Sequence, residues 1–198
     1  MNNKKPPMVF ISSRLDELKE ERNKTSEGIF ELWNDEDIPL KVWDWENTKE
    51  IPSGKSTYKV QSEGIGNSDI YVLILGSEYG YYKYGESPTH KEYKDACSEI
   101  EEDCVLIYIK EVKDREEKAD RWIKEIQKKH TPKKSFKTPD ELKNLIKNRL
   151  RDLWNKRKWG REAAKGSSGG SEVPTDPCPY PSPPIPSLGY IDGGIPKM

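Results

Sequence analysis

One carboxylate stands out because it follows a tyrosine-rich loop and lies where a helix is expected to begin. It is Glu92, in the stretch YGESPTHKEYKDA. The pattern THKE fits a capping box, in which Thr89 would cap the helix and the Glu92 side chain would accept a hydrogen bond from the Thr89 backbone amide. In the other frame Ser87 is the cap and Pro88 the first helical residue, so Glu92 is free to be the reactive group of an active site. We favour the second frame.

Polar and aromatic residues near two other segment ends are the candidate partners of Glu92. They are Ser12, Ser13, Arg14, Gly76, Ser77 and Tyr79, with Ser87 beside the helix start. Hydroxyls, a guanidinium, aromatic faces and a carboxylate together could hold a ribose, a phosphate and a flat base. Each has a structural alternative: the two serines can end a strand and cap a helix, and the loop tyrosines can pack over the sheet. Trp43 and Trp45 are a further possible wall.

The elements that position these residues alternate between strand and helix. Strands are predicted at MVFIS, IPLKVWDW, DIYVLILG and CVLIYIK, helices near 16–34, 56–66, 88–102, 115–129 and 139–158, and a short edge strand at KSFK. Continuous apolar runs are typical of strands buried on both faces. The alternation predicts an α/β, flavodoxin-like parallel sheet of four to five strands, order 2-1-3-4-5, with helices on both faces. Ligands bind such sheets beyond the carboxyl ends of strands 1 and 3, where the candidate residues lie.

Composition excludes several classes of function. The 34 Lys and Arg residues nearly balance 35 Asp and Glu residues, for a net charge of −1, so neither nucleic acid nor a membrane surface is the expected partner. We find no membrane-length apolar run and no signal peptide, which predicts a cytoplasmic protein. Three cysteines and two histidines lack metal-site spacing, so no metal is expected. Cys97 and Cys104 are expected to be small buried residues rather than a disulfide.

The chain is predicted to divide into an α/β domain at 1–160 and a tail at 161–198. The tail begins near GSSGGS and continues as a proline-rich stretch, the compositions of a flexible linker and an extended polyproline-type segment. A natural segment and an engineered or tethered peptide both remain open. Its apolar residues among prolines could dock on this domain or a neighbouring one.

Three ordered motifs, VFISSRLDELKEER, SDIYVLILGSEYG and GESPTHKEYKDA, resemble the TIR-like domain family of uncharacterised function found at the N-termini of bacterial STAND-type NTPases. The resemblance covers about Met8 to Trp154, and Arg14 departs from it where the family more often has Thr. It implies a fold shared with TIR domains, several of which cleave the N-glycosidic bond of NAD, and with nucleoside deoxyribosyltransferases. In the TIR NADases a glutamate on the helix after strand 3 is essential, and Glu92 matches it by position.

The resemblance also implies a function. It predicts a nucleotide N-glycosidase that cleaves NAD, or makes an NAD-derived signal, as an effector of bacterial immunity. NAD would be the substrate rather than a permanently bound cofactor, and self-association would be needed for activity. Two alternatives stay open: a non-catalytic module that senses a nucleotide or binds a protein on the same fold, and a deoxyribosyltransferase-like enzyme.

Overall fold

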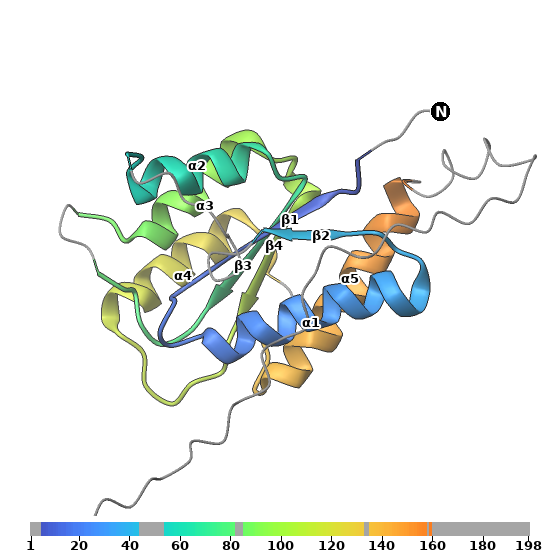
Figure 1. Cartoon of the computed structure of the whole chain (residues 1–198). Coiled ribbons are helices and arrows are strands. Elements are labelled where there is room, and N and C mark those ends of the chain that lie inside the picture. Colours follow the sequence, from blue (N-terminus) through green and yellow to red (C-terminus); the bar gives the residue numbers. More distant parts are fainter. Residues whose placement is uncertain (1–4, 44–53, 82–84, 133–134, 158, 160–198) are drawn as a thin grey trace, which may run out of the picture. The chain divides into compact units, whose positions relative to one another are not determined.

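The computed structural model describes residues 5–43, 54–81, 85–132, 135–157 and 159 (Figure 1). In chain order the elements are β1 (Met8–Ser13), α1 (Lys19–Glu36), β2 (Lys41–Trp43), α2 (Thr57–Gly66), β3 (Ile70–Leu75), α3 (Pro88–Glu99), η1 (Glu102–Cys104), β4 (Val105–Ile109), α4 (Glu117–Lys129) and α5 (Pro139–Arg157). Strands and helices alternate through β4, as the sequence predicts.

The four strands form one parallel sheet in the order β2-β1-β3-β4. β1 and β3 are the central pair, with Ser12 opposite Leu73 and Ser13 opposite Ile74. The predicted fifth strand is reduced to an isolated parallel bridge between Phe136 and Lys110, at the β4 edge. The flavodoxin-like α/β fold class is therefore confirmed, and the order follows the prediction through strand 4.

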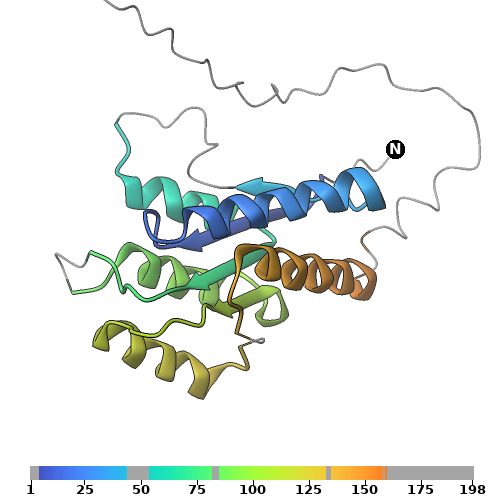
Figure 2. The same ribbon diagram turned by 90° about the horizontal axis from the view of Figure 1, so that it is seen from below.

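The sheet is the middle layer of three. Helices α2, α3 and α4 cover one face, while α1 and α5 lie side by side on the other (Figures 1 and 2). All six residues of β3 are buried, because helices cover both of its faces. The polar side chains that end the central strands therefore emerge at one edge of a rigid sheet.

Several boundaries differ from the sequence expectation. Helix α1 begins at Lys19 rather than at Asp16, because the chain first makes a turn in which the Leu18 amide donates to the Arg14 carbonyl. Strand β2 is described only over Lys41–Trp43. Ile38 lies just past the end of α1 at Glu36, and its amide donates back to the Leu32 carbonyl of that helix.

The cysteines divide between the core and the surface. Cys104 is buried, as expected, and both it and Cys97 are free thiols. The expectation that Cys97 is also buried is wrong, because Cys97, on α3, is exposed.

Helices in the described ranges lack the combination of length and apolar character that a bilayer crossing needs. The predicted tail at 161–198, Cys178, Trp45, Tyr82 and Tyr84 lie outside the described residues.

Candidate active site

The start of α3 decides whether Glu92 caps its own helix. Ser87 is the N-cap: its backbone is extended, its hydroxyl accepts the His90 amide at 3.2 Å, and Pro88 is the first helical residue. Glu92 lies beyond the third helical position and takes no part in capping. The capping-box alternative with Thr89 as cap is therefore wrong, and the frame that leaves the Glu92 side chain free is confirmed.

The Glu92 carboxyl is buried against the end of β1. Its side chain is only 5% exposed, and the Ser12 hydroxyl donates to Glu92 Oε2 across 2.5 Å. Burial raises the pKa of Glu92 to about 7, while the Ser12 hydrogen bond opposes that rise and Asp95 adds to it. Glu92 thus changes its protonation state near neutral pH, which is the property of a carboxyl group suited to acid–base or electrostatic catalysis.

Beside Glu92 is a cleft of about 160 Å³ at the carboxyl end of β1. Its lining comes from β1 and the loop after it, the start of α1, the end of β2, the first turns of α2 and α3, and the loops before α3. The lining residues are Phe10, Ile11, Ser12, Ser13, Arg14, Leu15, Arg22, Trp43, Thr57, Gln61, Gly80, Tyr81, Ser87, Pro88, Thr89 and Glu92. Five of the predicted site residues therefore meet here, namely Ser12, Ser13, Arg14, Ser87 and Glu92. This is the strand-1 side of the expected crevice.

Aromatic rings form one wall of the cleft. Trp43 stacks on Phe10 with ring centroids 4.4 Å apart and planes 9° from parallel. Gly64 of α2 allows this close approach, because a Cβ atom there would lie 2.7 Å from the Trp43 ring. The Trp43 wall agrees with the sequence interpretation, and the exposed Tyr81 adds a second ring at the cleft.

Two arginines bring positive charge to the same cleft. Arg22 is 3% exposed, and its guanidinium donates to Ser13 Oγ at 2.9 Å and to the Leu15 carbonyl at 2.9 Å. Arg14 lies nearer the surface, where it pairs with Glu78 at 3.0 Å and Asp16 at 3.1 Å. Both guanidiniums can contribute to binding an anionic group.

Sequence analysis did not identify Arg22 as a site residue. The signal that could have identified this arginine is its place in the first turn of the helix that follows β1. A helical side chain points back toward its N-terminus, so an arginine in the first turn of the helix after β1 reaches the loop at the strand end. The structure buries it there and uses it to hold Ser13.

Gly76 and Ser77 do not line the cleft. The Ser77 amide and hydroxyl both donate to Glu17 Oε1, at 2.5 and 2.6 Å, and the Glu78 amide donates to Glu17 Oε2. A Cβ atom at Gly76 would lie 2.3 Å from the same carboxylate, so any larger residue there would displace Glu17 from this position. Glu17 therefore fixes the start of the loop after β3, a role that sequence analysis did not identify.

Tyr79 also turns away from the cleft. Gly80 has a φ of +86°, and the chain turns there so that Tyr79 is 4% exposed while Tyr81 faces the cleft. The Tyr79 hydroxyl is hydrogen-bonded to His90 Nδ1 at 2.7 Å, and its ring lies edge-on to Trp122. Tyr79 is a packing residue between the β3 loop and α4 rather than a wall of the Glu92 cleft. His90 is half-buried in the same cluster.

Within the described ranges no group of three His, Cys, Asp or Glu side chains is arranged to hold a metal ion. The cleft instead offers one buried carboxyl, serine and threonine hydroxyls, two guanidiniums and aromatic faces. Such a set can bind an anionic, ring-containing ligand and stabilise positive charge beside Glu92.

Comparison with known proteins gives the family. Residues 8–151 match the family described as a domain of unknown function, DUF4062, and the chain belongs to that family. No curated protein matches it.

Solved structures are similar to this chain at low identity. A diflavin flavoprotein A3 from Nostoc sp. is 12% identical with a TM-score of 0.42, over 80% of this chain and 96% of that one. The Flv1 flavodiiron core from Synechocystis sp. is 12% identical with a TM-score of 0.42, and the match covers 78% of this chain and 36% of that one. The TIR domains of the activated Roq1 resistosome are 15% identical with a TM-score of 0.37, over 81% and 98%. At these values no functional conclusion follows.

Proposed function

We propose that this DUF4062 domain cleaves the N-glycosidic bond of a nicotinamide nucleotide, NAD or a close relative, with Glu92 as the essential carboxylate. The observation that carries the proposal is the Glu92 carboxyl itself. It is buried in a cleft, bonded to Ser12 from another element, and takes no part in capping its helix.

The chemistry requires one carboxylate and water. The bond between the ribose anomeric carbon and the ring nitrogen breaks, and its electron pair returns to the ring, so nicotinamide leaves as a neutral base that needs no proton. The oxocarbenium ion left on the sugar is stabilised or trapped by the Glu92 carboxylate. Water then adds to the anomeric carbon, displaces the carboxylate where it has trapped the sugar, and gives up one proton to solvent. The reaction is balanced without a metal or a redox partner.

The bound substrate would also set the charge of Glu92. Its pKa of about 7 leaves a mixture of protonated and ionised forms at neutral pH. A nicotinamide ring linked to ribose carries a positive charge, and an opposite charge nearby favours the ionised carboxyl. Substrate binding is thus expected to lower the Glu92 pKa and to generate the carboxylate that the reaction uses.

The other cleft residues suit such a substrate. Arg22 and Arg14 would meet phosphate oxygens, the latter after exchanging Glu78 and Asp16 for the ligand. Ser13 and Ser87 present hydroxyls for the ribose, and Trp43 and Tyr81 present rings for the base. Following the TIR-like resemblance of its sequence, we place the activity in a bacterial immune effector whose site is active in a self-associated state.

The test is release of nicotinamide from NAD by the full chain, repeated at rising protein concentration because assembly would raise the specific activity. Glu92→Gln keeps the size of the side chain and removes its charge, and should lower the rate about a hundred- to a thousand-fold. Glu31→Gln, on the opposite face of the sheet, is the matched control and should leave it unchanged.

Three results would overturn this proposal. Turnover that survives Glu92→Gln would exclude Glu92 as the essential group. Tight nucleotide binding without turnover at any protein concentration would indicate a sensor. Exchange of free bases into deoxynucleosides, with no loss of NAD, would indicate a deoxyribosyltransferase.

A further inference from the structure

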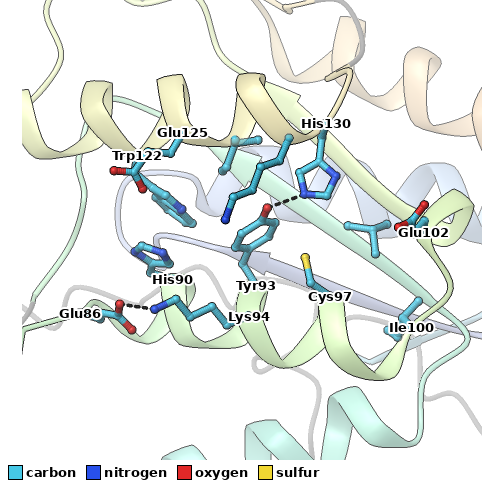
Figure 3. Close-up of a pocket in the computed structure, with 13 residues that line it drawn as sticks. Glu86, His90, Tyr93, Lys94, Cys97, Ile100, Glu102, Trp122, Glu125 and His130 are labelled. Atoms are coloured by element: carbon cyan, nitrogen blue, oxygen red, sulfur yellow. Dashed lines mark hydrogen bonds and ion pairs between the residues drawn. The ribbon is translucent and has the colours of Figure 1, made fainter.

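A second cavity lies between α3 and α4, on the same face of the sheet as the Glu92 cleft (Figure 3). Its volume of about 480 Å³ falls in the range of small-molecule sites and exceeds the 160 Å³ of the cleft. Among the described lining residues, none is shared between the two. Any ligand of this cavity is therefore bound separately from the Glu92 substrate.

The cavity has an apolar floor and a charged rim. Buried residues form the floor: Tyr93, Ile100, Trp122 and Ile126. The rim carries Glu86, Lys94, Glu102, Glu125 and Lys129. An apolar floor with polar groups around it is the usual make-up of a site for a small organic molecule.

The floor is a rigid aromatic cluster. Trp122 and His90 stack with centroids 4.4 Å apart and planes 21° from parallel, and Tyr93 meets Trp122 edge-on at 5.9 Å. These contacts lock the rings in place. The surface on which a flat ligand would stack is thus already formed, so binding would not require these side chains to become ordered.

Both histidines of the chain line this cavity, and each has one ring nitrogen bound to a tyrosine. Tyr79 pairs with His90 Nδ1 and Tyr93 with His130 Nε2, both at 2.7 Å. Burial lowers the pKa of His90, so its ring is neutral at neutral pH. Where the tyrosine hydroxyl donates, the other imidazole nitrogen carries the proton and is itself a donor. Within the described residues, His90 Nε2 and His130 Nδ1 have no hydrogen-bond partner.

The charges of the rim disfavour anions. Glu86 and Lys94 form an ion pair, which leaves Glu102 and Glu125 against Lys129. The lining thus has no excess positive charge, in contrast to the Glu92 cleft with its two arginines. Phosphate and carboxylate groups gain nothing here, whereas amino groups can donate to the rim carboxylates.

We infer that the α3/α4 cavity binds an uncharged or cationic nitrogen heterocycle, as a free base or a nucleoside without phosphate. The ring lies on the aromatic floor, its ring nitrogens accept from the imidazoles, and an exocyclic amino group donates to Glu125 or Glu102. This binding site does not depend on the proposed glycosidase activity.

Calorimetric titration of the full chain tests this assignment with adenosine and adenosine 5′-monophosphate, which differ only in the phosphate. Adenosine should bind with a Kd of about 1 mM or lower, and the monophosphate at least about tenfold more weakly at this site. Cys97 points into the cavity (Figure 3), so Cys97→Phe should occupy part of the space for the ligand and weaken adenosine binding about tenfold. Ser98→Phe makes the same change at the next, exposed position and should not.

Two further variants keep the result decisive. Glu92→Gln should leave adenosine binding intact, since its side chain lines the other cleft. The exposed Glu125→Lys should reverse the preference toward the monophosphate without risk to the core. Absence of adenosine binding up to about 10 mM, binding unaffected by Cys97→Phe in a folded variant, or binding lost in Glu92→Gln would each overturn the assignment.

Discussion

Two glutamates on opposite faces of the sheet show how differently this fold treats one residue type. Glu31, on α1, meets Lys143 at 2.9 Å and Lys147 at 2.6 Å from α5, and those hydrogen bonds lower its pKa to about 2. Glu92, on α3, is buried with a serine as its hydrogen-bond donor, and burial raises its pKa to about 7. The folded protein stabilises the ionised form of Glu31 through its lysine partners, whereas it destabilises the ionised form of Glu92 through burial.

The same contrast separates the two helical layers. Charged side chains of α1 and α5 form ion pairs between the two helices. An example is Arg151 and Glu36, which are joined by two hydrogen bonds of 2.5 and 2.6 Å. On the α3 face, by contrast, polar groups line a cleft and a cavity that remain open. We conclude that the α1/α5 layer mainly supports stability, while Glu92 and the lining of both hollows lie mostly on the α3 face, joined by Arg22 from the start of α1. Four predictions test this division.

The largest effect on stability is expected in the α1/α5 layer. Leu150→Ala removes a fully buried side chain of α5 and should lower the free energy of unfolding by about 2–5 kcal/mol, from lost burial and the cavity left behind. Urea denaturation measures it. Asn155→Ala, at an exposed position of the same helix, is the control. A loss below about 1 kcal/mol for Leu150→Ala would contradict the conclusion that the α1/α5 layer mainly supports stability.

Glu92→Gln should change how stability depends on pH. A carboxyl whose pKa rises from 4.5 unfolded to about 7 folded binds more protons in the folded state, so its contribution is fully present below pH 4.5 and is lost as pH rises through 7. The variant should therefore gain stability relative to the wild type across this window, by about 3 kcal/mol in total. If the free energy of unfolding differs between the two proteins by the same amount at about pH 5 and at about pH 8, Glu92 is not a buried carboxyl with a raised pKa.

Ser12→Ala should sharpen the role of the hydroxyl that meets Glu92. Without this donor the pKa of Glu92 should rise further, and unfolding at a pH where the carboxyl is ionised should become easier by about 2 kcal/mol. If the proposed activity holds, its pH profile should move to higher pH. Ser12→Thr keeps a hydroxyl and should restore both properties. Failure of Ser12→Thr to do so in a folded protein would indicate that packing of β1, rather than the hydrogen bond, matters.

The smallest effect is expected for Glu31→Gln. Its carboxylate is paired with two lysines but remains 29% exposed, so the loss at neutral pH should be about 0.5–1 kcal/mol at low salt. Because the native pKa is lowered from 4.5, the contribution of Glu31 should disappear as pH falls toward 2, the opposite sign to Glu92. The loss should shrink in about 1 M salt, where charges are screened. A salt-independent loss would mean that packing is the cause.

Local chemistry made part of this site predictable. Pro88 fixed the frame of α3, because proline suits the first helical position, and that frame frees Glu92. The alternation of strands and helices likewise predicts the parallel sheet, and with it the meeting of Ser12 and Glu92, 80 residues apart in the chain.

Tertiary contacts decided the rest. Nothing local distinguishes Tyr79 from Tyr81, and only the turn at Gly80 sends the first toward α4 and the second toward the cleft. Arg22 was not identified as a site residue because its partners, Ser13 and the Leu15 carbonyl, are brought near it by the turn before α1. Side-chain direction within loops depends on such contacts rather than on residue type.

The most direct test of the account is a carboxyl-carbon NMR titration of the glutamates in the wild type and Glu92→Gln. One resonance with a midpoint near pH 7, absent from the variant, would confirm that the cleft holds a buried carboxyl that ionises at neutral pH. If every glutamate titrates below about pH 5, Glu92 is solvated like a surface residue and the proposed active site lacks its reactive group.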